Sequence, residues 1–249
     1  MSLEIDDIHI SYGKVRAVDG VTVSLPTGGR LGVIGPNGSG KSTLINAISG
    51  AVTDRGTITI DGHRLRGGSQ RAAAHAGISR TYQTPQTFTE LSCIENVMLG
   101  LGPGDKRAKS TGAPRERREH RRTREALALL DEVGLLDLAE TSAAILTYGQ
   151  QQMLGLARAL ATNPLVLLLD EPAAGLNSAE TEALSTVLDK ANARGVALLL
   201  VEHKMDFVTK LCPRIAVLSG GKLVADGPHA EVLADPRVVD AYLGAPSNA

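Results

Sequence analysis

Hydrophobic and polar positions change their period along this chain of 249 residues. Residues 3–10 and 21–25 alternate apolar and polar side chains, which is typical of half-buried strands, and Pro26–Gly29 provides the turn after them. Further on, short continuous apolar runs alternate with helical patterns, which favours a largely parallel sheet covered on both faces. The pattern predicts strands at 31–34, 56–60, 78–81, 166–170, 196–201 and 215–218, and helices at 41–49, 179–193 and 204–211.

The middle of the chain has a different pattern. From residue 84 to about residue 160 helix signals dominate, and we interpret residues 84–160 as an inserted helical lobe. Ser92 and Glu95 form a capping-box pattern. Residues 102–111 are polar and contain glycine, as in a loop, while 115–133 and 147–161 predict helices.

Composition limits the class of protein. Hydrophobic residues make up 43% and charged residues 21%, as in an ordinary globular protein. The chain has no Trp, so its core must consist mainly of Leu, Val, Ile and Ala. A net charge of −1 offers no global field for attracting nucleic acid. The length suits one large domain or a domain with an inserted lobe.

Cysteine content and hydropathy indicate the compartment. Cys93 and Cys212 lack metal-binding spacing, so we expect two buried or inert thiols in a reducing compartment. The acidic, alternating N-terminus does not look like a signal peptide. The longest apolar runs are far shorter than the roughly 20 residues that cross a bilayer. If the protein acts at a membrane, another chain must do the crossing.

A glycine-rich loop carries the clearest chemical signal. It fits G-x-x-x-x-G-K-[ST] and consists of Gly35, Pro36, Asn37, Gly38, Ser39, Gly40, Lys41 and Ser42. The glycines allow successive backbone N–H groups to point at phosphate oxygens, and the following helix adds its positive end. We expect Lys41 to neutralise the β- and γ-phosphates and the Ser42 hydroxyl to bind Mg²⁺. The alternative is a chance glycine-rich turn, which the preceding apolar strand and following helix make less plausible.

Two carboxylates follow a buried strand. Asp170 ends the apolar run 165–169, where a charge is costly unless it has a partner, and a Mg²⁺ shared with Ser42 is one such partner. Glu171 can then act as the general base for an attacking water. The alternative is a plain strand-end turn.

Three single residues are candidates on weaker local signals. Gln83 follows the strand 78–81, where its amide could reach Mg²⁺ or the attacking water and move with the lobe. His203 follows the strand 196–201, at a carboxyl end suited to a γ-phosphate contact. Tyr12, one of few aromatic residues, could stack on adenine. The alternatives are a solvated loop glutamine, a structural histidine and a surface turn tyrosine.

A second helix start, at Leu146–Gln150, has the pattern of an anion site. Thr147 supplies a hydroxyl, Gly149 allows close approach, and Gln150 continues the turn. Two phosphate-binding helix starts in one chain suggest that two copies face each other and each closes the other's site. The alternative is a plain helix cap.

A basic run lies in the helical lobe. It is interleaved with Glu116, Glu119 and Glu125, and we favour a solvated helix face with i,i+3 and i,i+4 pairs over a phospholipid or partner contact. Nucleic-acid binding is a minor option, because the run has no aromatic residues. Its members are Lys106, Arg107, Lys109, Arg115, Arg117, Arg118, Arg121, Arg122 and Arg124.

In their order, these motifs resemble those of the ATP-binding subunits of ABC transporters. Gly35–Thr43 resembles the Walker A motif, Leu165–Glu171 Walker B and Leu146–Gln150 the signature. Gln83 corresponds to the Q-loop glutamine and His203 to the switch histidine. The resemblance covers essentially the whole chain. It implies a P-loop α/β fold with a mainly parallel core sheet, an N-terminal antiparallel β-subdomain and the inserted helical lobe. It also implies one ATPase domain over residues 1–249 that ends in a short helical tail, 225–249.

A narrower similarity concerns the ATPase subunits of branched-chain amino-acid importers. Thr147–Gln150, Glu171–Asn177, Val201–His203 and the tail 241–244 carry it; urea-type importers and the lipopolysaccharide-export ATPase share parts of the pattern. Thr147 replaces the commoner Ser, Asn177 the usual Asp, and Lys204 an acidic residue that commonly follows the switch histidine. None of these departures removes a catalytic group, so we expect an active ATPase.

The resemblance implies an ATP-hydrolysing motor with ATP and Mg²⁺ as its cofactors. Glu171, His203, Gln83 and Lys41 would be catalytic, Ser42, Gln83 and Asp170 would hold the metal, and the nucleotide would contact Tyr12, Gly35–Thr43, Thr147, Gly149 and Gln150. Its partners would be transmembrane permease subunits, a second identical or different ATPase subunit and, indirectly, a solute-binding protein. It would act at the cytoplasmic face of the cell membrane. The alternatives are a lipid or lipopolysaccharide exporter, a urea-type importer and, least favoured, a soluble ABC-type ATPase of DNA repair or translation.

Overall fold

The computed structural model describes residues 2–52, 55–65, 67–102 and 115–243. The chain divides into two compact units. The first consists of Met1–Arg80, Leu165–Glu171 and Asn192–Ala249, and the second of Thr81–Pro164 and Pro172–Ala191. The boundaries of the predicted single domain, lobe and tail stay predictions.

The first unit contains an antiparallel sheet at its N-terminus. Its strands are β1 (Ser2–Tyr12), β2 (Val15–Pro26), β4 (Arg55–Ile60) and β5 (His63–Arg64), in the order β2-β1-β4-β5. Buried and exposed residues alternate along β1 and β2, as the sequence predicts for strands with one buried face. Both strands are longer than the predicted ones and meet in a tight hairpin at Tyr12 and Val15.

A six-stranded sheet forms the other layer of this unit. Its order is β10-β9-β3-β8-β7-β6, and all neighbours are parallel except β9 and β10. The strands are β3 (Arg30–Ile34), β6 (Ile78–Arg80), β7 (Val166–Asp170), β8 (Ala197–Val201), β9 (Arg214–Ser219) and β10 (Lys222–Pro228). Every residue of β7 and β8 is buried, which explains their continuous apolar sequences. The predicted α/β fold with a mainly parallel sheet is confirmed.

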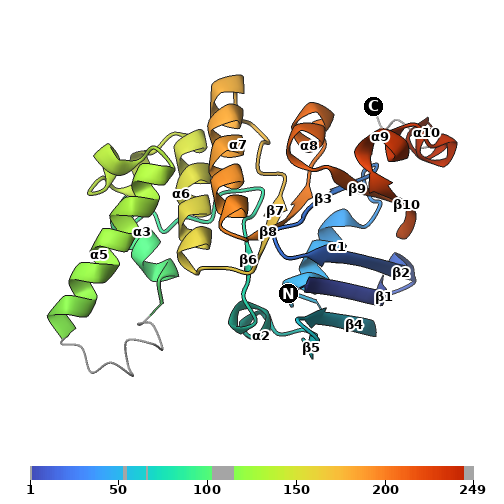
Figure 1. The fold of residues 1–249 in the computed structure, drawn as a ribbon, viewed down its shortest axis with the longest axis horizontal. Helices are drawn as coiled ribbons and strands as arrows, with labels where there is room; N and C mark the ends of the chain where they lie inside the picture. The colour runs from blue at the N-terminus through green and yellow to red at the C-terminus, as the bar shows by residue number, and fades with distance from the viewer. Residues whose placement is uncertain (1, 53–54, 66, 103–114, 244–249) are drawn as a thin grey trace. The chain divides into compact units, whose positions relative to one another are not determined.

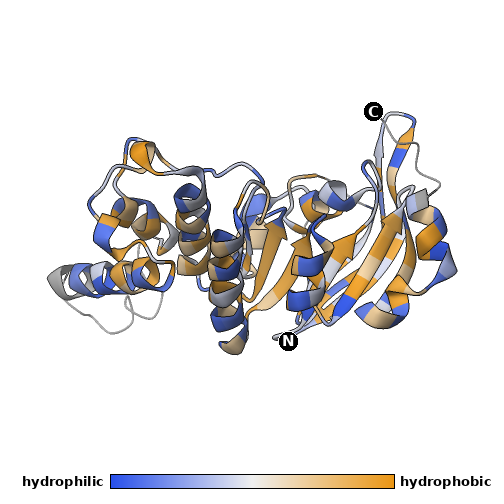
Figure 2. Cartoon of the chain, turned by 90° about the horizontal axis from the view of Figure 1, so that it is seen from above, coloured by the Kyte–Doolittle hydropathy of each residue, from blue (hydrophilic) through white to orange (hydrophobic). Residues whose placement is uncertain are grey.

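Helix α1 (Lys41–Ile48) packs between the two sheets (Figure 1). Its Leu44, Ile45 and Ile48 join residues of both sheets in one buried hydrophobic cluster. In Figure 2 the strands are mainly hydrophobic, whereas the helices carry hydrophobic and hydrophilic residues together. The helix that follows the glycine-rich loop is therefore anchored by the core of the unit.

The second unit is helical. Its α3 (Cys93–Gly100), α5 (Arg115–Glu132) and α6 (Tyr148–Ala161) pack against one another (Figure 1). α7 (Ser178–Ala193) belongs to this unit through residue 191. The predicted capping box of Ser92 and Glu95 is confirmed at the start of α3. A Cβ at Gly100 would collide with the carbonyl oxygen of Arg158, so this glycine permits the close approach of α3 and α6.

Several short elements were not predicted. They are α2 (Gln70–His75), β5, β10 and the 3₁₀ turns η1 (Leu136–Leu138) and η2 (Ala143–Ile145). The helices α8 (Met205–Leu211), α9 (His229–Leu233) and α10 (Pro236–Leu243) complete the chain, and the last two fall in the predicted tail. Both cysteines are buried free thiols, as expected. Among the described residues we find no helix with the length and hydrophobicity of a membrane span.

Candidate functional site

The glycine-rich loop follows β3 and leads into α1. Gly35 and Gly40 have backbone φ angles of 149° and 105°, which residues other than glycine rarely adopt. A Cβ at Gly35 would collide with the carbonyl oxygen of Leu218, and one at Gly40 with that of Ala17. Only glycine fits these two positions, and the close backbone contacts there hold the loop in its shape.

Lys41 lies inside this loop. Its side chain is 5% exposed, and its ammonium donates hydrogen bonds to the carbonyl oxygens of Gly35 (2.8 Å) and Pro36 (3.0 Å). Burial lowers the pKa of Lys41, and the nearby carboxylates of Glu171 and Asp170 oppose this by raising it. Gly40 caps α1 without a side chain, so no side chain competes for the first amides of the helix. The loop therefore presents a cation and backbone donors, which suits a polyphosphate.

Asp170, at the end of β7, has a protein partner that the sequence did not reveal. The residue is 8% exposed, and its carboxylate accepts a hydrogen bond from Arg80 Nη2 at 2.7 Å. The other arm of Arg80 donates to Asn46 Oδ1 (2.6 Å) and Ser49 Oγ (3.2 Å). Arg80 thus ties the end of β7 to α1, and its charge compensates that of the buried Asp170.

Glu171 and His203 are brought together, although they lie 32 positions apart. Glu171 Oε1 is 3.1 Å from His203 Nε2. The Glu171 backbone N–H donates to the Val201 carbonyl at 2.8 Å, and its φ of 48° lies in the left-handed region that non-glycine residues rarely occupy. Such backbone strain clusters at functional sites, where the surrounding structure holds it in place.

The loop that carries His203 is held by Glu202, which sequence analysis missed. Glu202 is 3% exposed, and its Oε2 accepts the backbone N–H groups of His203 (2.7 Å) and Lys204 (3.2 Å). An acidic residue at the end of an apolar strand was the available signal, since a buried carboxylate must have donors nearby.

In the second unit, Thr147 caps helix α6. The Thr147 hydroxyl accepts the Gln150 backbone N–H (3.3 Å), and the Gln150 side chain accepts the Thr147 N–H (2.9 Å). This is a reciprocal capping box. Gly149 lies against the carboxylate of Glu180, with which any Cβ at this position would collide. The turn is therefore a helix cap, as the alternative interpretation predicts, and the anion-binding role of its residues stays a prediction.

Gln83 also lies in the second unit and is linked to the same helix. Its backbone carbonyl accepts hydrogen bonds from the Tyr148 hydroxyl (3.0 Å) and from Gln152 Nε2 (2.9 Å). Asn177, which stands where the family usually has Asp, caps α7: its Oδ1 accepts the Glu180 N–H at 2.9 Å. Residues 106–109 of the basic run lie outside the described residues, and Arg121 and Glu125 form one of the expected i,i+4 pairs at 3.5 Å.

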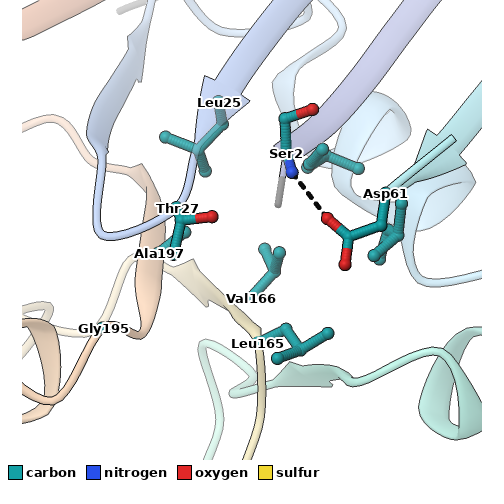
Figure 3. Close-up of a pocket in the computed structure, with 10 residues that line it drawn as sticks. Ser2, Leu25, Thr27, Asp61, Leu165, Val166, Gly195 and Ala197 are labelled. Carbon is teal, nitrogen blue, oxygen red and sulfur yellow. Dashed lines mark hydrogen bonds between the residues drawn. The ribbon is translucent and has the colours of Figure 1, made fainter.

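The pocket in Figure 3 lies at the opposite edge of the core sheet from the glycine-rich loop. Val166 and Ala197 of its wall are the first residues of β7 and β8, whereas the loop follows the carboxyl end of β3. Its walls are mainly apolar, with a hydrogen bond from the Ser2 N–H to Asp61 (2.9 Å). Ligands of such sheets bind beyond the carboxyl ends of the strands, so this pocket is not a candidate for the nucleotide.

Comparison with protein families identifies the chain. The family model described as ABC transporter matches residues 18–174, which include the glycine-rich loop, Asp170, Glu171 and Leu146–Gln150. The chain belongs to the ABC transporter family. A second model, branched-chain amino acid ATP-binding cassette transporter, matches residues 222–247.

Curated relatives match this ABC chain over nearly its full length. The high-affinity branched-chain amino acid transport ATP-binding protein BraF of Pseudomonas aeruginosa is 36% identical over 97% of both chains. The protein LivG of Escherichia coli K12, of the same description, is 34% identical over the same shares. A probable LivG of Methanocaldococcus jannaschii is 33% identical, again over 97% of each chain.

Solved structures agree with the fold. The ADP conformation of an ATP-binding cassette of an ABC transporter matches with a TM-score of 0.83 and 32% identity over 98% of this chain and 99% of that one. A dimeric post-hydrolysis cassette bound to ADP and phosphate matches with a TM-score of 0.76 and 25% identity over 91% and 98% of the two chains. The ABC chain is thus an ATP-binding subunit and a transport-coupled ATPase, as the sequence predicted.

The candidate residues of this chain fall into two groups, one in each compact unit. Lys41, Asp170, Glu171 and His203 come together in the first unit, while Gln83, Thr147, Gly149 and Gln150 share the second. Tyr12 lies at the end of β1 and is 51% exposed, as a stacking surface must be. Among the described residues no three His, Cys, Asp or Glu side chains form a metal cluster.

Proposed function

We propose that this chain is the motor subunit of an importer for branched-chain or other hydrophobic amino acids. The observation that carries the proposal is the match of residues 222–247 to the branched-chain amino acid cassette model, because this segment lies beyond the general ABC match at 18–174. The named relatives, BraF and LivG, support it with 33–36% identity over nearly the whole chain. In this architecture the membrane-spanning partners select the solute.

In this proposal the first unit binds and hydrolyses ATP. The backbone of Gly35–Thr43 and the Lys41 ammonium bind the β- and γ-phosphates, and the exposed ring of Tyr12 stacks on the adenine. The Ser42 hydroxyl, the Asp170 carboxylate and the Gln83 amide would hold Mg²⁺, which would neutralise phosphate charge when bound. A hydroxyl, a carboxylate and an amide are oxygen donors of the kind that Mg²⁺ prefers, so the residues present fit this metal.

Glu171 is the proposed general base. Its carboxylate would accept a proton from the attacking water, and His203, 3.1 Å away, would hold the Glu171 side chain and contact the γ-phosphate. Glu202 keeps the His203 backbone in place through its two amide contacts. The left-handed backbone of Glu171 would aim its side chain away from the β7 ladder.

The second unit completes the site of another subunit. We infer that Thr147, Gly149 and Gln150 meet the γ-phosphate held by the partner's Lys41, so two ATP molecules close a head-to-tail dimer. Hydrolysis reopens the dimer, and the helical unit with Gln83 passes the motion to the permease subunits at the cytoplasmic face of the membrane. The second ATPase subunit is identical or closely related, and a solute-binding protein delivers the amino acid.

Uptake by a reconstituted transporter tests the proposal. We expect the chain, assembled in vesicles with permeases encoded beside it and their binding protein, to drive ATP-dependent leucine uptake. Glu171→Gln should keep ATP binding and lower hydrolysis and uptake by about 10²- to 10⁴-fold, because the amide accepts no proton. Glu231→Gln, an exposed change on α9, is the matched control and should leave both rates unchanged.

Two outcomes would contradict different parts of the proposal. Hydrolysis by Glu171→Gln at the wild-type rate would remove the base role from Glu171. If urea or lipid stimulates ATP hydrolysis and leucine does not, the proposed import of amino acids is wrong. The chain would then belong to a urea-type importer or a lipid exporter.

A further inference from the structure

A triangle of hydrogen bonds links residues 83–88, the segment that follows β6, to the start of α6. We call residues 83–88 the Gln83 segment. The Tyr148 hydroxyl donates to the Gln83 carbonyl at 3.0 Å, and Gln152 Nε2 donates to the same carbonyl at 2.9 Å. Gln152 Nε2 also donates to the Tyr148 oxygen at 3.2 Å, so the three polar groups form a closed triangle. In the chain from the Gln152 amide through the Tyr148 hydroxyl to the Gln83 carbonyl, the hydroxyl both accepts and donates, so the two bonds strengthen each other.

The triangle is supported on the side of α6. Gln152 is buried, while the ring of Tyr148 lies on Gly175, whose φ is 75° and where a Cβ would come within 3.0 Å of Tyr148 Cε1. Tyr148 is also the first residue of α6, directly after the cap Thr147. The same side chain therefore touches the Gln83 segment and the 172–177 loop, while its backbone belongs to the signature turn, Leu146–Gln150.

The Gln83 segment is anchored at its other end as well. The fully buried Asn96 of α3 accepts the Phe88 N–H (2.8 Å) and donates to the Phe88 carbonyl (2.9 Å). The Arg158 guanidinium of α6 lies 5.2 Å from the centre of the Phe88 ring. Residues 83–88 are thus fixed to the helices of the second unit at both ends.

We propose that Tyr148, with Gln152, is a positioning residue that makes the Gln83 segment and the signature turn move as one body. This inference rests on the proposed function, in which Gln83 serves the ATP held by its own subunit and Leu146–Gln150 the ATP held by the partner. A link between the two within one chain couples one ATP site to the other. Without it, each site would respond to its own nucleotide alone.

Hydrogen–deuterium exchange tests the link itself. Tyr148→Phe removes the hydroxyl but keeps the ring on Gly175, and Gln152→Met removes the amide at similar length. In the nucleotide-free full chain, each change should speed exchange of the amides of residues 83–88 by about three- to tenfold, as expected for one lost hydrogen bond. The double variant should show less than the product of the two effects, because both donors share one acceptor.

Gln151→Met is the matched control. Gln151 is the neighbouring glutamine on α6, and its amide donates to the Leu146 carbonyl at 3.2 Å rather than to the Gln83 segment. It should leave exchange at residues 83–88 unchanged. Unchanged exchange in Tyr148→Phe, or an equal effect of Gln151→Met, would overturn the link.

Cooperativity of ATP hydrolysis tests the coupling. Tyr148→Phe should lower the Hill coefficient for ATP towards 1 with a smaller effect on the maximal rate, whereas a role in folding alone would lower the active fraction and leave the Hill coefficient unchanged. Faster exchange with wild-type cooperativity would overturn the coupling. A wild-type chain that hydrolyses ATP without any cooperativity would instead contradict the proposed dimeric motor, and the exchange result would still decide whether the link exists.

Discussion

At the scale of single residues, Arg80 shows how a site depends on side chains outside the motifs. The side chains of Asp170 and Arg80 are only 11% and 9% exposed. Arg80 Nη2 lies 2.7 Å from Asp170 Oδ2. Arg80→Met would leave the Asp170 carboxylate without this charge. We expect a loss of about 3–5 kcal/mol in the free energy of unfolding, measured by urea denaturation, because a buried charge then lacks its partner.

Arg214→Met is the control for this change. Arg214 and Asp226 are as close, 2.6 Å, and Arg214 also donates to the Ser24 carbonyl, but the arginine side chain is 33% exposed, so the expected loss is smaller, about 1–2 kcal/mol. Equal losses in the two variants would mean that burial does not decide the contribution of the Arg80 pair.

At the scale of elements, the first turn of α6 shows how closely a glycine can approach a neighbouring side chain. A Cβ at Gly149 would collide with the Glu180 carboxylate, while a Cβ at Gly155 on the same helix would meet nothing within 4 Å. We expect Gly149→Ala to destabilise the chain by about 0.5–1.5 kcal/mol, because the Glu180 carboxylate must move and lose its hydrogen bond from the Asn177 N–H. Gly155→Ala should stabilise it by up to about 1 kcal/mol, since alanine is the better helix former.

A double-mutant cycle assigns the Gly149 effect to its cause. Glu180→Ala removes the colliding carboxylate, so Gly149→Ala should cost at least about 0.5 kcal/mol less in the Glu180→Ala background than in the wild type. Urea unfolding of the four proteins measures this difference. If Gly149→Ala costs the same in both backgrounds, the close packing of α6 against Glu180 is not what makes this glycine necessary.

The elements also show what the sequence could and could not predict. Continuous apolar runs located β7 and β8 because both strands are buried on both faces, and the cap at Ser92 was visible in four consecutive residues. β5 was missed because it has only two residues, both exposed, and so carries no periodic signal. The Arg80–Asp170 pair was missed because its members lie 90 positions apart and neither residue type at a strand end predicts the other.

The candidate site was likewise predictable from the sequence in its local parts and not in its long-range contacts. The glycine-rich loop is local, so its residues and their conformations followed from one motif. The meeting of Glu171 with His203 depends on the register of β7 against β8, in which Asp170 pairs with Val201, and a sequence pattern does not contain that register. Tyr148 was passed over because its hydroxyl acts on a backbone carbonyl 65 positions away.

At the scale of the whole molecule, the proposed composite site predicts complementation between two inactive variants. Lys41→Met removes the phosphate cation, and Gly149→Asp places a second carboxylate beside Glu180 in the turn that would face the partner's ATP. Each variant alone should lack ATPase activity, and Gly149→Asp should still bind ATP as a monomer. In a head-to-tail dimer of one copy of each, both defects fall in one site, and the other site keeps an intact loop and an intact turn.

An equal mixture of the two variants should therefore recover up to about a quarter of the wild-type ATPase rate, because half of the dimers are mixed and each has one intact site of two; coupling between the two sites lowers this value. The control is the double variant mixed with wild type: its mixed dimers have one defect in each site and should add nothing to the activity of the wild-type pairs. A mixture of the single variants with no recovered activity, although light scattering shows that dimers form, would contradict the shared site. If no dimer of this chain forms with ATP, the partner must be a different ATPase subunit, and the same pair of variants divided between the two subunits repeats the test.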